Sequence, residues 1–207
     1  MKGLDGLRAF CDDLASDQPA PGGGTASAAA GGMAASLLVM VCAITRKSKK
    51  YEASWVELDK LKPEIETCRD RLIALSAEDS HAYEEVVAAF KAKKEADTEE
   101  SRETVARALA HATDVPQMTA SECIKVLEFA DTVAQRGTRS AYSDVGVAVL
   151  LANAGLKGAL MNVMINVEGS QDTAYRDSMM KEIAADRSRG DALAKAALER
   201  LGKGHHA

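Results

Sequence analysis

The stretch LDKLKPEIETCRDRLIALSAEDSHAYEEVVAAF, residues 58–90, decides the fold of this 207-residue chain. Its apolar residues recur in alternating steps of three and four, which is the spacing of a long helix with one buried face. The stripe consists of Leu58, Leu61, Ile65, Cys68, Leu72, Leu75, Asp79, Ala82, Val86 and Ala89, and it is widened by Tyr83, Val87 and Phe90. Because the register is unbroken across Pro63, we expect a kink there, with a helix start at Pro63 as the alternative.

Helical periodicity returns along the rest of the chain, and no segment shows the sustained period-2 alternation of a strand. We predict helices over residues 2–15, 25–45, 118–134, 143–167 and 172–201, and a further helix from Thr98 through Leu109. We also predict a breaker segment at 16–24 and a turn or helix restart at Pro116. The predicted N-caps are Thr25, Thr98, Ser143 and Ser170. The expected fold is an all-α, single-domain helical bundle of long, partly kinked helices over residues 1–207.

The composition is that of a packed globular protein, with 46% hydrophobic and 28% charged residues. A formal charge of −5 gives no electrostatic footprint for a nucleic acid. The uncharged stretch 19–45 consists mostly of small residues, and its strongly apolar part, 37–44, is shorter than the ~20 residues that a membrane span needs. We therefore expect a cytoplasmic protein that has neither nucleic acid nor membrane as a partner.

The cysteines and histidines form no metal-binding pattern. Cys11, Cys42, Cys68 and Cys123 are widely spaced, contain no CxxC pair and lie in helical apolar contexts. We predict that all four are reduced thiols in or near the core, and that the chain holds no metal site. His205 and His206 are interpreted as part of a fraying tail.

Asp79 is the one acidic residue at a core position of the stripe. A buried carboxylate is costly unless it is hydrogen-bonded, neutral or functional. One interpretation is a surface residue on a helix that turns out of the core after Leu75. The other is a carboxylate held in an apolar cleft, where it suits acid–base work.

The segment PAPGGGT, residues 19–25, places Gly22, Gly23 and Gly24 directly before a helix. Glycines at a helix N-terminus let backbone amides approach a ligand, and the helix dipole favours an anion there. The segment is not a Walker A loop, because no GK[ST] follows. The alternative is that the glycines only form a turn.

Two further groups of polar residues are candidate ligand contacts. Asn162 and Asn166 share one face of the 143–167 helix with Asp144, Ala148, Leu151, Gly155 and Gly158. Buried amides need partners, so these two bond either a neighbouring helix end or a ligand. The run Arg46, Lys47, Lys49 and Lys50 is either a solvated helix end or a site for a dicarboxylate.

Three stretches together resemble the cyclodeaminase/cyclohydrolase family of folate enzymes. They are PAPGGGTASAAAGGMAASLLVMV from residue 19, DSHAYEEVVAAFK from residue 79 and SDVGVAVLLANAGLKGALMNVMINV from residue 143. The resemblance implies an all-α homodimer that binds folate near helix ends and the dimer seam. It also implies that Asp79 is catalytic and that Gly22, Gly23, Gly24, Ser143, Asp144, Asn162 and Asn166 contact the substrate. Family members commonly have Leu-Pro-Lys where this chain has Ala92, Lys93 and Lys94, which puts the geometry of that loop in doubt.

The resemblance implies two activities on the same carbon of tetrahydrofolate. We expect a methenyltetrahydrofolate cyclohydrolase, because a formiminotetrahydrofolate cyclodeaminase without a transferase domain needs another protein to supply its substrate. A non-catalytic folate-binding or scaffold relative is a third alternative. The implied substrate is a tetrahydrofolate derivative with no further cofactor, and we expect Lys49 and Lys50 to bind its anionic glutamate tail.

Overall fold

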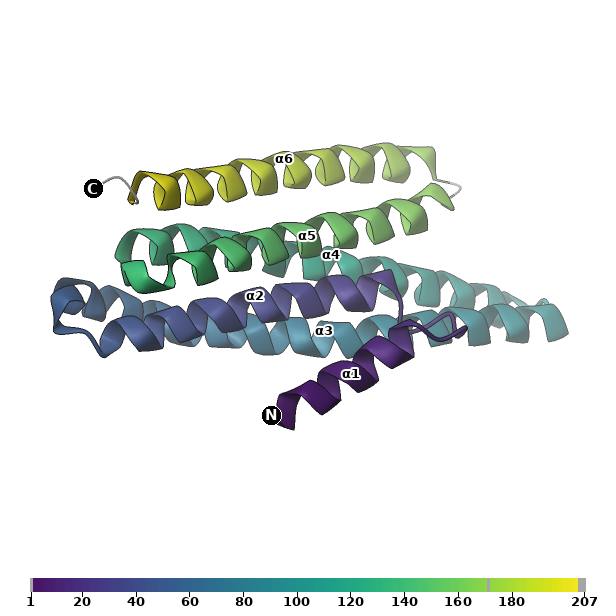
Figure 1. Ribbon diagram of the computed structural model, residues 1–207. Coiled ribbons are helices and arrows are strands. Elements are labelled where there is room, and N and C mark those ends of the chain that lie inside the picture. Colours follow the sequence, from purple (N-terminus) through teal and green to yellow (C-terminus); the bar gives the residue numbers. More distant parts are fainter. Residues whose placement is uncertain (1, 171, 205–207) are drawn as a thin grey trace.

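The computed structural model describes residues 2–170 and 172–204, and every regular element in this part of the chain is a helix (Figure 1). The long helices are α1 (Lys2–Leu14), α2 (Gly23–Arg46), α3 (Trp55–Glu95), α4 (Glu99–Arg136), α5 (Tyr142–Glu168) and α6 (Thr173–Gly204). Two short 3-10 helices, η1 (Lys49–Ser54) and η2 (Arg139–Ala141), precede α3 and α5. The predicted all-α bundle of long helices is confirmed.

Helix α2 packs between α3 and α5, with α4 behind it and α6 against α5 and α4 (Figure 1). Helices α2 and α5 are antiparallel, since Ser27 near the start of α2 lies against Gly158 near the end of α5. At the opposite end, the backbone amide of Thr138 donates to Thr45 Oγ1. The fully buried interior includes Leu38, Leu72, Val126, Leu127 and Leu156. Burying each of these contributes roughly 1.5–3 kcal/mol, so the interior fixes the helix ends that carry the site.

Small residues allow α2 and α5 to approach closely at the end where Gly23 and Gly24 lie. A Cβ on Gly155 would lie 2.7 Å from the Ser27 carbonyl oxygen. A Cβ on Gly158 would overlap the Ser27 hydroxyl. Larger side chains would separate the two helices, because side-chain size at a crossing sets the distance between helix axes.

Two prolines lie inside continuous helices. Helix α3 runs through Pro63 without a break, which confirms that the helix does not begin there. The turn or helix restart predicted at Pro116 is wrong, because Pro116 lies within α4. A proline cannot donate to the carbonyl four residues earlier. In α4 that carbonyl belongs to Ala112, and it accepts instead from Asn166 Nδ2 of α5 at 2.6 Å. A side chain of α5 thus supplies the donor that Pro116 lacks.

Of the predicted N-caps, that of α4 is confirmed and that of α2 is wrong. Thr98 caps α4 as predicted, and its Oγ1 accepts from the Ser101 amide. The prediction for Thr25 is wrong: Gly22 is the N-cap of α2, and Thr25 lies in the first turn. Glycine is an acceptable N-cap, so the Thr25 hydroxyl is available for another partner.

The caps predicted for the last two helices are also wrong. Helix α5 begins at Tyr142, so Ser143 is an exposed residue of its first turn. Helix α6 begins at Thr173, and the Asp172 carboxylate accepts a backbone amide of its first turn. Ser170 lies two residues before Asp172, and its hydroxyl accepts from the Asp172 amide.

The cysteine prediction is correct for three of the four thiols. Cys42, Cys68 and Cys123 are buried and free. Burial raises the pKa of Cys42 to about 11, and it raises that of Cys123 to about 12. The prediction is wrong for Cys11, which is exposed because α1 does not join the bundle core. His205 and His206 lie outside the described residues.

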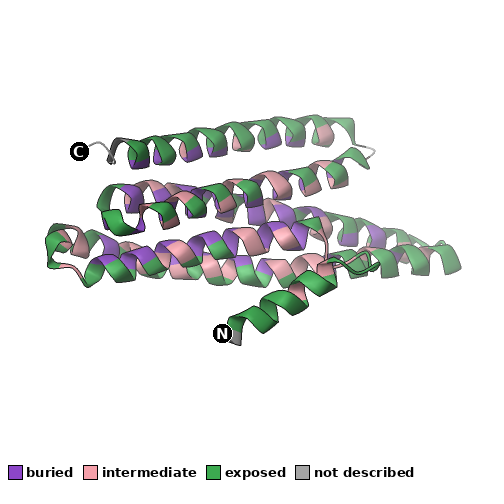
Figure 2. Ribbon diagram, viewed as in Figure 1, coloured by how far each residue is buried: buried purple, intermediate pink, exposed green. Residues whose placement is uncertain are grey.

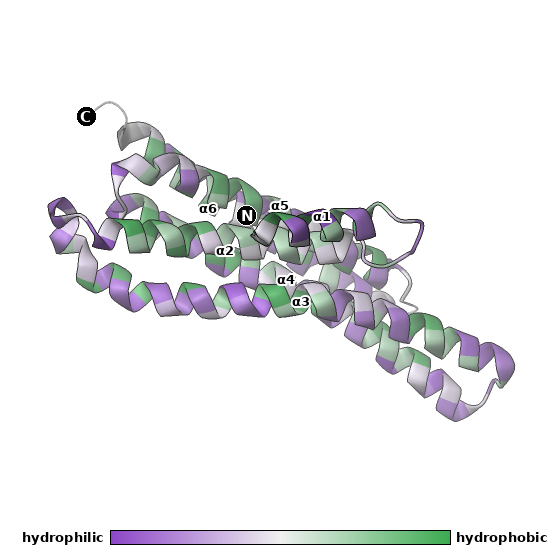
Figure 3. Ribbon diagram, turned by 60° about the horizontal axis from the view of Figure 1, so that its bottom comes forward, coloured by the Kyte–Doolittle hydropathy of each residue, from purple (hydrophilic) through white to green (hydrophobic). Residues whose placement is uncertain are grey.

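One face of the bundle is apolar, and no other described segment of the chain covers it. We call it the α2–α5 face, and it consists of Met33, Met40 and Ile44 of α2 and Val147, Leu150, Met161 and Ile165 of α5. Both helices are hydrophobic along their length (Figure 3). Helix α1 stands off the bundle, and its Leu4 and Leu7 are exposed (Figure 2). Gly23–Arg46 and Arg139–Glu168 are long and apolar enough to cross a membrane, although about half of each apolar window is buried inside the protein.

Candidate functional site

Asp79 lies against the first turn of α2. Its carboxylate is so close to Gly24 that a Cβ on this glycine would overlap Asp79 Oδ1 and would lie 2.6 Å from Cγ and 2.7 Å from Oδ2. Asp79 itself is half-buried. It therefore lies at the junction of α2 and α3, neither inside the core nor free on the surface.

Thr25 binds one side of this carboxylate, and Ser80 in turn contacts Thr25. Thr25 Oγ1 donates to Asp79 Oδ2 at 2.9 Å and lies 3.1 Å from Ser80 Oγ. Thr25 is only 3% exposed. Oδ1 of Asp79 lies nearest to Gly24 and accepts no hydrogen bond from the described residues, so Oδ2 is hydrogen-bonded and Oδ1 can still accept one.

The start of α2 also favours a negative charge. The backbone amides of the first turn, from Gly23 to Thr25, have no acceptor within the helix, and the helix dipole is positive at this end. Residues 19–45 carry no charge, so no side chain of α2 before Arg46 opposes the dipole or forms an ion pair with Asp79. The arrangement suits an ionised carboxylate that accepts a proton, or an anionic group of a ligand.

Asn162 and Asn166 approach the same end of the bundle from α5. A Cβ on Gly23 would lie 3.8 Å from Asn162 Nδ2, which donates to the Gly158 carbonyl. Asn166 Nδ2 donates to Ala112, as described above. Each amide nitrogen thus donates one of its two protons to a backbone carbonyl, which leaves the second proton and the amide oxygen available to a ligand.

An apolar track that the periodicity did not reveal follows Asp79 along α3. Tyr83, Val87 and Phe90 were expected to widen the buried stripe, and this expectation is wrong, because each is 42–50% exposed. They belong to the last four turns of α3. Helices α3 and α4 leave the bundle together as a two-helix arm (Figure 3). The arm is held by its own small cluster of Ala89, Val105 and Ala108, which leaves the outer side of α3 uncovered.

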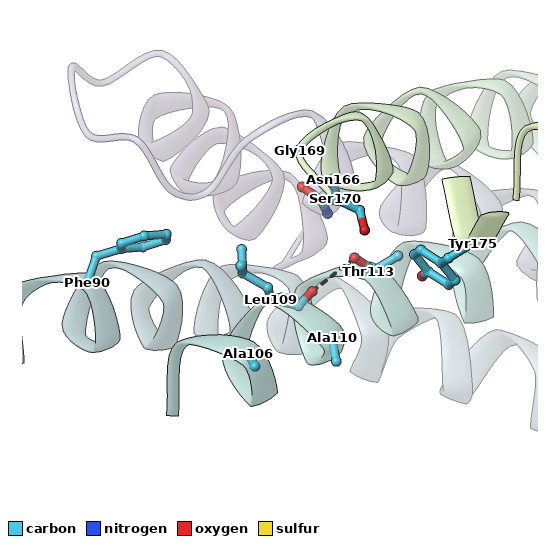
Figure 4. Close-up of a pocket in the computed structure, with 9 residues that line it drawn as sticks. All are labelled: Phe90, Ala106, Leu109, Ala110, Thr113, Asn166, Gly169, Ser170 and Tyr175. Carbon is cyan, nitrogen blue, oxygen red and sulfur yellow. Dashed lines mark hydrogen bonds between the residues drawn. The ribbon is translucent and has the colours of Figure 1, made fainter. Parts of the chain in front are cut away.

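Two pockets adjoin this track. The first, about 390 Å³, contains Phe90 and Tyr175 with Asn166 and Ser170 at one side and Leu109 and Thr113 at the other (Figure 4). The second, about 600 Å³, lies between the loop before α2 and α3, and it is lined by Gln18, Pro19, Ala20, Tyr83, Glu84, Val87, Ala88 and Lys91. Both pockets are largely apolar with a few polar groups at their edges, which is typical of small-molecule sites.

Four of the predicted contact residues lie at the other end of the bundle. Lys49 and Lys50 are exposed in η1, after the last turn of α2. Ser143 and Asp144 open α5 nearby, where the Arg139 amide donates to Tyr51 of η1. Helix α2 has 24 residues, which makes it about 36 Å long. Within one subunit these four residues therefore do not join Asp79, Gly22, Gly23, Gly24, Asn162 and Asn166.

Ala92 and Lys93, where the chain departs from the family pattern, lie with Lys94, which matches it, in the arm near its tip. Ala92 lines a separate surface pocket with Arg107 and with the hydrogen-bonded pair Glu85 and His111. Among residues 2–170 and 172–204, no three His, Cys, Asp or Glu side chains come together as a potential metal site. The absence of a metal or further cofactor stays a prediction.

The fold and the site define an all-α protein in which the half-buried carboxylate of Asp79 lies against the N-terminus of a glycine-rich helix. Residues 6–185 match the family model described as formiminotransferase-cyclodeaminase. The chain belongs to this family.

Among its relatives, a methenyltetrahydrofolate cyclohydrolase of Methylorubrum extorquens is 36% identical over 88% of this chain and 89% of that protein. The formimidoyltransferase-cyclodeaminase of Rattus norvegicus is 28% identical over 86% of this chain, which spans only 34% of that protein. The crystal structure of a formiminotetrahydrofolate cyclodeaminase from Thermotoga maritima superposes with a TM-score of 0.84 at 27% identity, covering 95% of this chain and 96% of that one.

Proposed function

We propose that the protein is a methenyltetrahydrofolate cyclohydrolase, which hydrolyses 5,10-methenyltetrahydrofolate to 10-formyltetrahydrofolate. The observation that carries the proposal is the Asp79 carboxylate, which is held through Oδ2 and has Oδ1 available. The match to the Methylorubrum cyclohydrolase over most of both chains supports this choice of reaction.

Asp79 acts as the proton acceptor and donor in this reaction. Water attacks the methenyl carbon of the cationic ring, a C–O bond forms, and one water proton passes to Asp79 Oδ1 to leave a neutral carbinolamine. The bond from this carbon to N5 then breaks as the C=O bond forms. N5 takes the proton from Asp79 and the hydroxyl proton leaves, so that one proton is released overall. A positioned acid–base group contributes about 10²–10⁴-fold to such a step.

The apolar track supports the binding of an aromatic ligand. Tyr83, Val87 and Phe90 follow Asp79 on α3 and offer exposed apolar surface to the rings of folate, as aromatic side chains commonly do. In the pocket that contains Phe90, the Asn166 amide oxygen and the Ser170 hydroxyl offer hydrogen bonds to the polar edge of the pteridine.

Cyclodeamination is the second candidate reaction, and the Thermotoga structure favours it because that stand-alone protein has nearly the same extent as this chain. In this reaction N10 attacks the formimino carbon on N5, ammonia leaves and the methenyl ring closes. The same carboxylate would move the protons.

We further infer that the protein is a cytoplasmic homodimer joined through the α2–α5 face. This face is long and apolar and carries Leu150 and Ile165, which are 59% and 64% exposed. Apolar area of this kind on a protein commonly marks an interface with another molecule. A second copy of the chain offers the same apolar face, and a two-fold axis makes such a face self-complementary.

The dimer supports a role for Lys49 and Lys50 that a single subunit cannot provide. A two-fold axis perpendicular to α2 and α5 would bring the η1 end of one subunit towards the Gly24 end of its partner. Lys49 and Lys50, with Ser143 and Asp144 beside them, would then approach the folate bound at the other subunit's Asp79. The cluster would bind the anionic glutamate tail.

Replacement of Asp79 by Asn tests the proposed function directly, because it keeps the volume and removes the base. We expect the Asp79→Asn variant to remain folded by circular dichroism and to lose at least ~100-fold in kcat, measured from the absorbance of methenyl-folate. A parallel assay with formimino-folate decides between the two reactions. Turnover of either folate at the wild-type rate by Asp79→Asn would exclude Asp79 as the base.

A further inference from the structure

We propose that Thr25 is a positioning residue, which fixes the proton-accepting oxygen of Asp79 through a directional chain of hydroxyl groups that begins at Ser80. The inference rests on the proposed acid–base role of Asp79. Thr25 thereby has a function, although its buried hydroxyl neither caps α2 nor belongs to the glycine segment 22–24.

The direction of the chain follows from the donor inventory of the three groups. An ionised carboxylate can only accept, so the hydrogen bond of 2.9 Å between Thr25 Oγ1 and Asp79 Oδ2 uses the single Thr25 proton. The contact of 3.1 Å between Thr25 and Ser80 must then have Ser80 as its donor. Ser80 donates to Thr25, and Thr25 donates to Asp79.

This direction determines which carboxylate oxygen takes up a proton. Oδ2 already receives the Thr25 hydroxyl proton, whereas Oδ1 receives no hydrogen bond from the described part of the chain. A proton taken from water therefore adds to Oδ1, and Oδ2 continues to accept from Thr25 in the neutral acid. The same hydrogen bond thus persists in both protonation states, so Asp79 does not need to reorient between accepting and returning the proton.

The location of Thr25 allows it to hold this geometry. It is 3% exposed in the first turn of α2, directly after Gly24, whose Cα lies against the same carboxylate. Gly24 limits Asp79 sterically on one side and Thr25 binds it on the other. Ser80 is the residue after Asp79 on α3, so the chain of hydroxyls also ties the first turn of α2 to the helix that carries the base.

Two substitutions of Thr25 separate the hydroxyl from its packing. Thr25→Val keeps the shape and removes the donor, whereas Thr25→Ser keeps the donor. We expect Thr25→Val to lower kcat about 10–100-fold with KM changed less than ~3-fold, the loss typical of groups that orient a reacting residue. Thr25→Ser should stay within ~3-fold of the wild type. If Thr25→Val does not fold, Thr25→Ala is the second variant.

Thr119→Val is the matched control, because Thr119 is equally buried and its hydroxyl bonds only the Val115 carbonyl of its own helix. It should keep wild-type kcat. In an Asp79→Asn background, Thr25→Val should cause no further loss, since residues that act as a unit are not additive. A multiplicative loss in the double variant, or wild-type kcat in Thr25→Val, would overturn the proposal.

A crystal structure of Thr25→Val gives a readout that does not depend on activity. We expect the Asp79 carboxylate to leave the position seen in the wild type or to occupy two rotamers. A single, unchanged carboxylate position would overturn the inference even if the protein catalyses neither folate reaction. Absence of turnover in the wild type, by contrast, would reject only the proposed function.

Discussion

Replacement of Gly24 by alanine should separate activity from stability. The added methyl carbon would lie 2.6 Å from Asp79 Cγ and 2.7 Å from Oδ2. Non-bonded heavy atoms pack at about 3.5 Å or more, and Oδ1 would be nearer still to the added carbon, so the carboxylate must retreat by more than about 1 Å. A displacement of about 1 Å at a reacting group costs on the order of 100-fold in rate. We therefore expect kcat to fall about 100-fold in the methenyl-folate absorbance assay.

The effect on stability should be small because two contributions oppose each other. Alanine in place of glycine inside a helix gains about 0.5–1 kcal/mol. The weakened hydrogen bond from Thr25 to Asp79 loses about 1.5–3 kcal/mol. The net loss is about 0.5–2.5 kcal/mol, which corresponds to a decrease in Tm of a few degrees for a chain of this size.

Gly146→Ala is the control for the helix contribution alone. Its methyl group would lie 3.7 Å from Leu201 Cδ1, an ordinary contact, at a position far from Asp79 along α5. This variant should keep its activity and gain slightly in Tm. Wild-type kcat in Gly24→Ala would refute the contact between Gly24 and Asp79 as a feature of the working site.

Three further predictions concern the dimer, the basic cluster and the thiols. Leu150→Glu places a charge on the α2–α5 face and should raise the dimer dissociation constant at least ~100-fold in analytical ultracentrifugation, whereas Leu198→Glu on α6 should not. Lys49→Ala combined with Lys50→Ala should weaken polyglutamyl folate more than monoglutamyl folate, and the difference should shrink as salt rises; an equal effect on both ligands would argue against tail binding. Cys11 alone should react rapidly with a thiol reagent at pH 8, counted by mass spectrometry, because burial raises the pKa of Cys42 to about 11 and that of Cys123 to about 12. Labelling of more than one thiol in the folded protein would contradict this.

The sequence predicted the parts of the fold that depend on helical periodicity. The stripe through Leu58, Leu72 and Leu75 is buried as expected, because a period near 3.6 leaves a helix one face to pack. The same reasoning failed for Tyr83 and Phe90. Periodicity shows that residues share a face of a helix. It does not reveal that α3 extends beyond the helices that would cover this face.

The candidate site was predictable only in part. The glycines before α2 pointed to a close approach, and Asp79 in an apolar stripe pointed to an unusual carboxylate. That Gly24 and Asp79 touch each other depends on how α2 and α3 pair, which local spacing does not encode. Thr25 was interpreted as an N-cap because threonine is favoured there, and only its contact with α3 reveals its bond to Asp79.

In α4, Pro116 has no backbone amide proton, and Asn166 of α5 donates in its place. This arrangement constrains which substitutions the chain can accept at either position. Pro116 leaves the Ala112 carbonyl without its backbone donor, and the Asn166 amide fills the vacancy. Replacing Pro116 alone would add a second donor to an oxygen that Asn166 already satisfies, and replacing Asn166 alone would leave that oxygen unsatisfied. The two positions, which are 50 residues apart in the sequence, are thus a linked pair. In descendants of this sequence, a change at one position should be followed by a change at the other, and their co-variation would report the packing of α4 on α5.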